Sequence, residues 1–429
     1  MCCNTRVTDL ARVDRVLAAV DDCADEIVEF ASALIRIPTV NPPGNHYTEC
    51  AEFIGQRLAT CGFAIDYVAA EGRSEHTASH PRVNVIGRRA GRTGRPTVHL
   101  NGHFDVVPAG AGWTIDPFGG IVRDGRIYGR GACDMKAGIA AAVYAAEALR
   151  RADITLNGSV EISGTVDEES GGFAGVAYLA GQKRLSADHV DYVIIPEPLN
   201  VDRVCIGHRG VYWFELETRG RIAHGSMPFL GVSAIDHMAR VIDRIRRDLA
   251  PSLAGKTTSM PVVPDAARHA TLNINGIAGG QPVDGIQTPC VADVCRAVFD
   301  RRFLAEEAFD DVRSEIEALM TVATCDVPGL QVTLRDLMVV PPVRTPDGSP
   351  LVGTLERQIH QVLGRPAVQV ASPGTYDHKH VDRIGGIKHC VAYGPGILDL
   401  AHQPDEWCGV DDLVNATKVI ALTLQDLLH

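Results

Sequence analysis

Hydrophobic residues in the first part of the chain recur with two periods, one typical of helices and one typical of buried strands. Apolar positions between residues 27 and 35 fall at helical spacing, and Pro38 ends that helix. Short apolar runs predict strands at 97–100, 159–166 and 191–195. A longer apolar pattern predicts a helix at 135–150. Strands that alternate with helices favour an α/β fold with a central, mostly parallel sheet flanked by helices.

The pattern changes at about residue 209. The stretch GVYWFELETRG alternates apolar and polar residues as an antiparallel strand does, and a surface helix and further strands follow without βα alternation. After about residue 340 the α/β pattern resumes and ends in a helix. We therefore predict one α/β domain from residues 1–208 and 340–429, interrupted by an α+β domain at 209–339.

Length and charge narrow the class of protein. A chain of 429 residues is long for one hydrophobic core, which favours two domains. Its 41 basic and 53 acidic residues give a net charge of −12, which argues against a nucleic-acid or anionic-membrane partner. No apolar run is long enough to span a bilayer. The 12 cysteines form no CxxC pair and no signal peptide is recognisable, so we expect reduced thiols and a cytoplasmic location.

Three consecutive acids follow the strand predicted at 159–166. In the stretch GTVDEESGG, Asp167, Glu168 and Glu169 stand side by side with no basic neighbour. Crowded carboxylates repel one another, and a bound cation would relieve that repulsion. The triplet therefore raises the hypothesis of a metal site at the end of this strand.

Other metal-binding residue types also lie near predicted strand ends or helix starts. In α/β sheets ligands bind beyond the carboxyl ends of the strands, so these side chains can converge although they are distant in sequence. The candidate ligands are His103, Asp134, Glu169, Glu197 and His402. Carboxylates and imidazoles without thiolate suit zinc, manganese or cobalt. Five ligands are too many for one open zinc site, but they suit two divalent ions that share a bridging carboxylate.

Five motifs, in this order and spacing, make the chain resemble one family of metallopeptidases. They are GHFDVVPAG, GRGACDMKAG, TVDEES, IIPEP and GPGILDLAHQPDEW. The family contains acetylornithine deacetylase, succinyl-diaminopimelate desuccinylase, aminoacylase and the carboxypeptidase G group. The resemblance covers nearly the whole chain. It implies a di-metal α/β catalytic domain and an inserted α+β lid that forms homodimers.

The resemblance also implies a role for each candidate ligand. His103 and Glu197 resemble ligands of the first metal, and Glu169 and His402 resemble ligands of the second. Asp134 resembles the carboxylate that bridges the two. The family pattern further implies a cis peptide bond between Asp134 and Met135.

Three more residues resemble catalytic residues of the family. Asp105 resembles the carboxylate that orients the His103 ring. Glu168 resembles the general base, which takes a proton from the attacking water and returns it to the leaving nitrogen. His224, in the inserted domain, resembles the histidine that polarises the substrate carbonyl, often from the partner subunit.

The substrate-binding residues depart from the family pattern. Arg209 and Arg302 fall where relatives bind a substrate carboxylate, and a guanidinium can hold such a group with two hydrogen bonds. The inserted domain lacks the family's usual asparagine, for which Gln287 is a candidate substitute. Lys379 replaces the usual arginine in the stretch GTYDHKHV, where Tyr376, His378 and His380 are also unusual.

Three functions stay open on the sequence alone. The leading interpretation is a hydrolase that cleaves the amide of a small N-acyl amino acid or related carboxylate. The second is an aryl aminohydrolase, because the similar enzyme 5-nitroanthranilate aminohydrolase replaces a ring amine with hydroxide. The third is a non-catalytic binding protein, against which the retained Glu168 and metal ligands argue.

Overall fold

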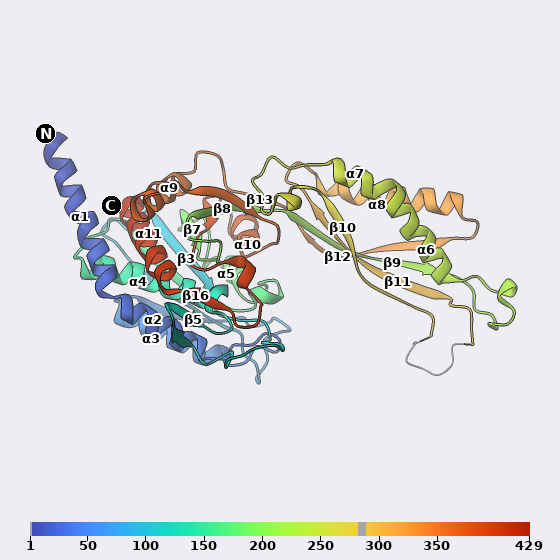
Figure 1. Ribbon diagram of the computed structural model, residues 1–429, viewed down its shortest axis with the longest axis horizontal. Coiled ribbons are helices and arrows are strands. Elements are labelled where there is room, and N and C mark those ends of the chain that lie inside the picture. The colour runs from blue at the N-terminus through green and yellow to red at the C-terminus, as the bar shows by residue number, and fades with distance from the viewer. Residues whose placement is uncertain (1, 282–288) are drawn as a thin grey trace. The chain divides into compact units, whose positions relative to one another are not determined.

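Residues 2–281 and 289–429 are described by a computed structural model, and they form two units (Figure 1). Unit 1 comprises Met1–Gly207, Thr345–Val370 and Tyr376–His429, and unit 2 comprises His208–Arg344 and Ala371–Thr375. Gln287 lies outside the described residues.

Unit 1 is built on a large sheet whose central strands are parallel. Along the sheet the order is β1-β2-β6-β3-β7-β15-β8, and β14 pairs with β8. The strands are β1 (Ala64–Ala69), β2 (Val83–Arg89), β3 (Thr97–His103), β6 (Ser159–Thr165), β7 (Tyr192–Ile195), β8 (Arg203–His208), β14 (Val368–Ser372) and β15 (Cys390–Ala392). The four strands β6, β3, β7 and β15 pair in parallel, and β1, β2 and β8 pair antiparallel at the sides. The predicted central parallel sheet is confirmed.

Helices flank this sheet (Figure 1). They are α1 (Cys2–Asp22), α2 (Ala24–Ile35), α3 (Tyr47–Thr60), α4 (Ala137–Arg151), α5 (Val176–Gly181), α9 (Pro350–Leu363), α10 (His378–Arg383) and α11 (Val410–Leu428). Helix α4 is rich in alanine and is buried from Ala137 to Leu149, because small side chains let it pack closely against β3 and α11. A small sheet of β4 (Ile121–Arg123), β5 (Arg126–Tyr128) and β16 (Trp407–Gly409) completes the unit. No helix within the described ranges is long and apolar enough to cross a membrane.

The two faces of β3 differ in chemistry although every residue of the strand is buried. Val98 and Leu100 belong to the apolar core that β3 shares with α4 and α11. His99, Asn101 and His103 alternate with them and therefore lie on the opposite face. The neighbouring strand β6 repeats this alternation. One face of the central sheet thus holds the hydrophobic core, and the other carries a buried row of polar side chains.

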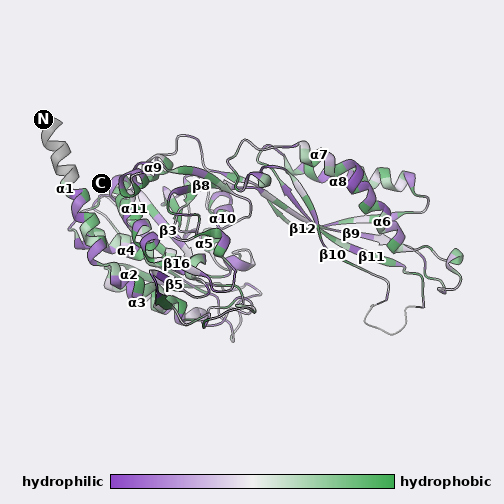
Figure 2. Cartoon of the chain, viewed as in Figure 1, coloured by the Kyte–Doolittle hydropathy of each residue, from purple (hydrophilic) through white to green (hydrophobic). Residues whose placement is uncertain are grey.

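Unit 2 has an antiparallel sheet in the order β10-β11-β9-β12. The strands of this sheet are β9 (Gly210–Arg219), β10 (Thr271–Gly279), β11 (Val294–Phe303) and β12 (Gln331–Val340), and the short β13 (Val343–Arg344) lies outside it. The helices of the unit are α6 (Ala234–Arg244), α7 (Ala250–Gly255) and α8 (Phe309–Asp326). Phe214 and Phe299 pack with Met238 of α6 and Ile316 of α8 in one core. Apolar and polar residues alternate along β9 and β11 (Figure 2). One face of the sheet is therefore covered by helices, and the other carries charged residues.

Candidate metal centre

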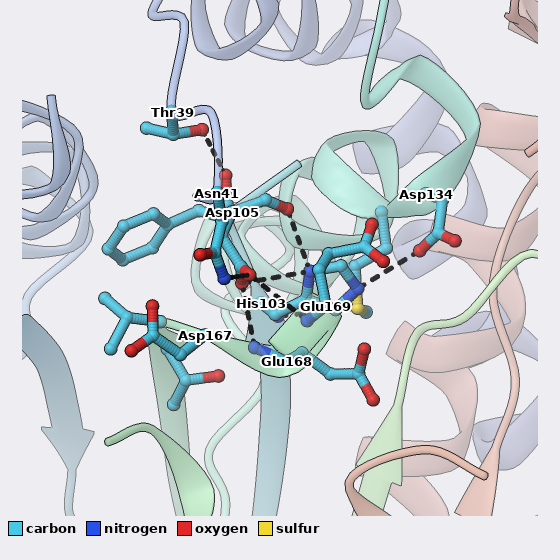
Figure 3. A network of polar contacts seen from close by, with 12 residues as sticks. Thr39, Asn41, His103, Asp105, Asp134, Asp167, Glu168 and Glu169 are labelled. Carbon is cyan, nitrogen blue, oxygen red and sulfur yellow. Dashed lines mark hydrogen bonds and ion pairs between the residues drawn. The ribbon is translucent and has the colours of Figure 1, made fainter. Parts of the chain in front are cut away.

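Carboxyl ends of neighbouring strands, a turn and a loop bring the predicted ligands together, and Figure 3 shows His103, Asp134 and Glu169 among them. His103 is the last residue of β3, Glu169 lies in a short turn after β6, and Glu197 follows β7. Asp134 comes from the turn Ala132–Lys136 that precedes α4, and His402 from the loop before β16. The peptide bond between Asp134 and Met135 is cis, as predicted.

The donor atoms fall into two sets that share Asp134. On one side, His103 Nε2 lies 3.1 Å from Asp134 Oδ1 and 3.9 Å from Glu197 Oε1. On the other side, His402 Nε2 lies 3.5 Å from Asp134 Oδ2 and 3.1 Å from Glu169 Oε1. Donor atoms of His103, Asp134 and Glu169 all lie within 4.8 Å of one another. Ligand atoms that surround one ion at about 2.0–2.2 Å have such separations, so the arrangement suits two divalent cations with Asp134 between them.

Hydrogen bonds orient the ring of His103 so that its Nε2 faces the other donor atoms. Its Nδ1 lies 3.1 Å from the backbone carbonyl oxygen of Asp105 and 3.5 Å from the Asp105 carboxylate. A carbonyl oxygen accepts only, so Nδ1 carries the ring proton and Nε2 presents a lone pair to the donor set. The carboxylate of Asp105 accepts from the backbone N–H groups of Glu168 and Glu169, at 3.1 and 3.2 Å, and from Asn41 Nδ2 at 2.9 Å. Asp105 therefore ties the acidic turn to the loop after β3 (Figure 3).

The electrostatics of the cluster indicate a need for positive charge. Burial raises the pKa of Glu169 to about 7, and burial and the charge of Asp134 raise the pKa of Glu197 well above its ordinary value. Hydrogen bonds to Asp134 and Glu169 raise the pKa of His402 to about 10. Protons thus compensate the crowded carboxylates, and bound cations would supply the same compensation. The donor set fits divalent metal ions.

The three acids of the triplet have different surroundings. Asp167 accepts from Arg82 Nε at 3.0 Å and from Tyr47 OH at 2.9 Å, both far away in sequence. Lys379 is buried, and its Nζ lies 3.5 Å from Glu168 Oε1. Glu169 faces His402. Asp167 thus anchors the turn, whereas Glu168 pairs with Lys379 and Glu169 with His402.

The remaining predicted residues belong to unit 2. Arg209 is buried and donates from Nη1 to the carbonyl oxygen of His269 and from Nη2 to that of Pro373, at 3.0 and 3.1 Å. Arg302 holds Asp300 with two bonds of 2.8 and 2.9 Å. Both guanidinium groups therefore already have protein partners, and their role in binding substrate stays a prediction.

His224 is exposed in a loop of unit 2, and its protonation can be inferred from its contacts. The backbone N–H of Ser226 donates to His224 Nδ1 at 3.2 Å. A neutral ring therefore carries its proton on Nε2. The Nε2–H group of His224 can therefore donate a hydrogen bond to a carbonyl oxygen.

Sequence reasoning missed Glu406, a buried carboxylate beneath the turn that carries Asp134. Its Oε1 accepts from the backbone N–H groups of Gly131, Cys133 and Asp134 at 3.0, 2.8 and 3.2 Å. Its other oxygen accepts from Arg130, which also donates to the carbonyl oxygen of His402 at 3.1 Å. The pair thus links the turn of Asp134 to the loop of His402. Glu406 lies within the last sequence motif, but nothing near it in sequence indicates a partner 276 positions away.

We expect Glu406→Gln to weaken metal binding about 10–100-fold, the usual effect of losing a group that supports metal ligands. The new amide has one acceptor oxygen, which cannot serve both the three backbone N–H groups and Arg130. Competition with a chelator measures the affinity, and Glu71→Gln, at an exposed position, is the control. Equal affinities in the two variants would show that Glu406 does not support the ligands.

Comparison with known proteins identifies the family of the chain. The sequence model of Peptidase family M20/M25/M40 matches residues 99–426. A succinyl-diaminopimelate desuccinylase from Psychrobacter arcticus is 26% identical over 409 residues, which cover 94% of this chain and 95% of the relative. N-formyl-4-amino-5-aminomethyl-2-methylpyrimidine deformylase from Bacillus subtilis is 28% identical over 438 residues, 94% of each chain.

Solved structures share the fold over almost the whole length. A di-peptidase from Saccharomyces cerevisiae superposes with a TM-score of 0.74 at 16% identity and covers 96% of this chain and 98% of its own. An aminopeptidase from Bacillus cereus has a TM-score of 0.74 at 20% identity, with 94% and 98% covered. A dinuclear metal-binding peptidase from Bacillus subtilis has a TM-score of 0.69 at 18% identity, with 95% and 99% covered.

Proposed function

The chain belongs to peptidase family M20/M25/M40, and from this membership we propose that it hydrolyses the amide bond of a small N-acyl amino acid or related carboxylate. The proposal includes two divalent cations, with zinc the first expectation and manganese or cobalt the alternatives. The observation that carries it is Asp134, whose two carboxylate oxygens face two separate donor sets. Besides Asp134, the ligands of one cation would be His103 and Glu197, and those of the other would be Glu169 and His402.

The relatives favour an amide substrate. The desuccinylase, the deformylase and the di-peptidase described above are all named for cleaving an amide or peptide C–N bond. The chain is accordingly a hydrolase of C–N bonds rather than a binding protein of the same fold. None of these names supports the aryl aminohydrolase considered from the sequence.

Glu168 moves the proton in the proposed reaction. Divalent cations held by the donor sets would supply positive charge that makes water nucleophilic at neutral pH and polarises the carbonyl oxygen. A carboxylate oxygen of Glu168 accepts the proton of the attacking water and returns it to the leaving nitrogen. Asp105 fixes the backbone of Glu168. Lys379 pairs with the Glu168 carboxylate, with its Nζ 3.5 Å from Glu168 Oε1.

The substrate's own carboxylate needs a cationic partner, for which Lys379, Arg209 and Arg302 stay the candidates. Lys379 already pairs with Glu168, so a substrate carboxylate bound there would lie beside the base. The net charge of −12 makes local cations important for an anionic substrate. We also propose that unit 2 acts as the lid of a homodimer that works in the reducing cytoplasm.

We expect His224→Ala to lower kcat about 10²–10³-fold, the usual cost of removing one donor to a developing oxyanion. Metal content should not change, because His224 is outside the proposed ligand set. Mixing His224→Ala with Glu168→Ala subunits tests whether the histidine acts across a dimer, since one site of the mixed dimer would hold both native residues. Full activity of His224→Ala alone would remove the histidine from the mechanism.

Metal analysis combined with a substrate panel tests the proposed function. The panel contains N-succinyl, N-acetyl and N-formyl amino acids, dipeptides, and aminobenzoates for the aryl alternative. We expect release of a carboxylate and an amine, about two metal ions per chain, and loss of activity with chelator. Ammonia and a phenol from an aminobenzoate would instead establish the aryl reaction, and metal-free protein with no turnover would refute both.

A further inference from the structure

A line of buried polar side chains runs along the polar face of β3 and β6, beside the donor sets. Glu161, His99, Ser163 and Asn101 are each at most 3% exposed. Glu161 Oε2 lies 3.1 Å from His99 Nδ1, and His99 Nε2 lies 2.7 Å from Ser163 Oγ. Ser163 Oγ donates to Asn101 Oδ1 at 2.7 Å, and Asn101 Nδ2 donates to Asp377 Oδ2 at 3.2 Å. The proposed reaction assigns no role to this line.

The direction of each hydrogen bond in the line follows from the chemistry of its members. Asn101 uses its amide N–H on Asp377, so its oxygen accepts the hydroxyl proton of Ser163. Ser163 has only one proton to donate, so it accepts from His99, and Nε2 must carry a hydrogen. His99 Nδ1 lies 3.1 Å from Glu161 Oε2, and a hydrogen bond between these two atoms needs one further proton. The ring of His99 and the carboxylate of Glu161 share this proton. Burial raises the pKa of Glu161, but the hydrogen bond and charge of His99, together with the charges of His189 and Arg88, outweigh burial and hold this pKa below its ordinary value.

At its other end the line reaches the turn that carries Glu168. Asp377 directly precedes α10, and a Cβ added at Gly172 would lie only 2.6 Å from Asp377 Oδ1. The side chains of the first turn of α10 continue this contact. Lys379 Nζ lies 3.5 Å from Glu168 Oε1, and His380 Nε2 donates to the carbonyl oxygen of Gly171 at 2.7 Å. These contacts fix the start of α10 against the segment from Glu168 to Gly172.

We propose that His99 is a positioning residue for Glu168, and that it acts through Ser163, Asn101 and Asp377 on the first turn of α10. The proposal rests on the proposed function, because Glu168 is the base of that reaction. His99 itself lies between Glu161 and Ser163 and has no part in the donor sets. Buried polar networks become rigid when their members are hydrogen-bonded, and Glu161, His99, Ser163 and Asn101 each bond to the next member of the line.

The proposal predicts how the line responds to pH. If the Glu161–His99 pair loses its shared proton to solvent, a neutral ring faces an ionised carboxylate. The carboxylate only accepts, so the remaining ring proton is held at Nδ1 and Nε2 becomes an acceptor. The hydroxyl of Ser163 then turns to His99, and Asn101 Oδ1 keeps only the longer contact with Thr165, at 3.4 Å. The support of Asp377 weakens, so kcat should fall as the pH rises.

Other charged groups near the line have to be considered in reading such a pH profile. Arg88 of β2 lies 3.6 Å from Glu161 Oε1, and His189, from the segment before β7, lies 3.8 Å from Glu161 Oε2. Opposite His99, β7 contributes the apolar Val193. From α10, Lys379 lies beside Glu168, and burial and the charge of Glu168 raise the pKa of Asp377, at the end of the line, to about 7. Arg88 and His189 both act on Glu161, so the test alters Glu161 directly.

Two variants and a matched control test the proposal. In Glu161→Gln the new amide donates to His99 Nδ1, so a neutral ring keeps its proton on Nε2 and the line stays intact at high pH. Ser163→Ala breaks the line at every pH. Ser159→Ala is the control, because Ser159 is a fully buried residue of the same strand whose hydroxyl donates to the carbonyl oxygen of Gly94 at 2.8 Å, outside the line.

We expect Ser163→Ala to lower kcat about 10-fold or more at neutral pH, with KM and metal content near those of Ser159→Ala. The alkaline decline of kcat in the native enzyme should shift to higher pH or vanish in Glu161→Gln. The proposal is overturned if Ser163→Ala matches Ser159→Ala in kcat, or if the native enzyme and Glu161→Gln have the same alkaline profile. If Ser163→Ala does not fold, the nearly isosteric Glu161→Gln decides by its profile.

A spectroscopic measurement separates failure of this proposal from failure of the proposed function. Nitrogen NMR of labelled histidine in the full chain, assigned with His99→Asn, reports which ring nitrogen carries a proton without any substrate. A protonated His99 Nε2 at neutral pH supports the line even if no substrate in the panel is turned over. An unprotonated Nε2 overturns it, whatever the activity.

Discussion

We expect Glu168→Gln to lower kcat by at least about 10²–10⁴-fold, the usual contribution of a general base, while both metal ions stay bound. An amide has nearly the size of the carboxylate and can still accept from Lys379, but it cannot take up a proton from water. The loss should exceed the effect of one proton transfer, because the same group also returns the proton to the leaving nitrogen. Steady-state kinetics and metal analysis of the purified variant measure the two quantities.

The neighbouring acid provides the matched control. Asp167→Asn removes the ionised partner of Arg82, whose side chain is buried. Breaking a buried ion pair typically costs about 3–5 kcal/mol of stability, so this variant should lose thermal stability and keep kcat within a few-fold of the native enzyme. If Asp167→Asn lost turnover as severely as Glu168→Gln, the acidic turn would act as a unit and Glu168 would not be the specific base.

The acidic triplet illustrates what the sequence can reveal. Three adjacent acids after a strand indicated a site, and their order within a family motif assigned a role to Glu168 and Glu169. No local pattern could show that Asp167 bonds to Arg82 and Tyr47, because those contacts form only when distant strands and helices pack together. The same holds for Glu406 and Arg130. Groups that support a site from behind are determined by tertiary structure rather than by local sequence.

The fold was predictable where periodicity was clear. The core strands β3, β6 and β7 and the long helix α4 were predicted nearly within their bounds. Helix α3 and the antiparallel strands β1 and β2 were not predicted. In β3 and β6 the alternation of apolar and polar residues resembles that of a half-exposed strand, yet both faces are buried. The polar face is tolerated because its side chains satisfy one another's hydrogen bonds, and alternation alone cannot reveal such partners.

The metal content of Asp134→Ala should show the second large effect. Asp134 directs Oδ1 toward His103 and Oδ2 toward His402, so its removal takes a ligand from both proposed sites at once. We expect loss of both ions from the purified variant and loss of measurable turnover. His402→Ala should instead weaken mainly one site, because His402 approaches only the set that contains Glu169. Elemental analysis after dialysis against low metal concentrations measures the ions per chain.

Thermal stability gives a second measure of the same effect that does not depend on turnover. A ligand that binds only the folded state stabilises it by about 2.7 kcal/mol at a concentration of 100 Kd. The Tm of the native chain should therefore rise with added zinc or manganese, and the Tm of His402→Ala should rise less. The Tm of Asp134→Ala should not respond at concentrations that saturate the native enzyme. Two ions per chain in Asp134→Ala, or a metal-dependent rise in its Tm equal to that of the native chain, would show that this carboxylate does not join two metal sites.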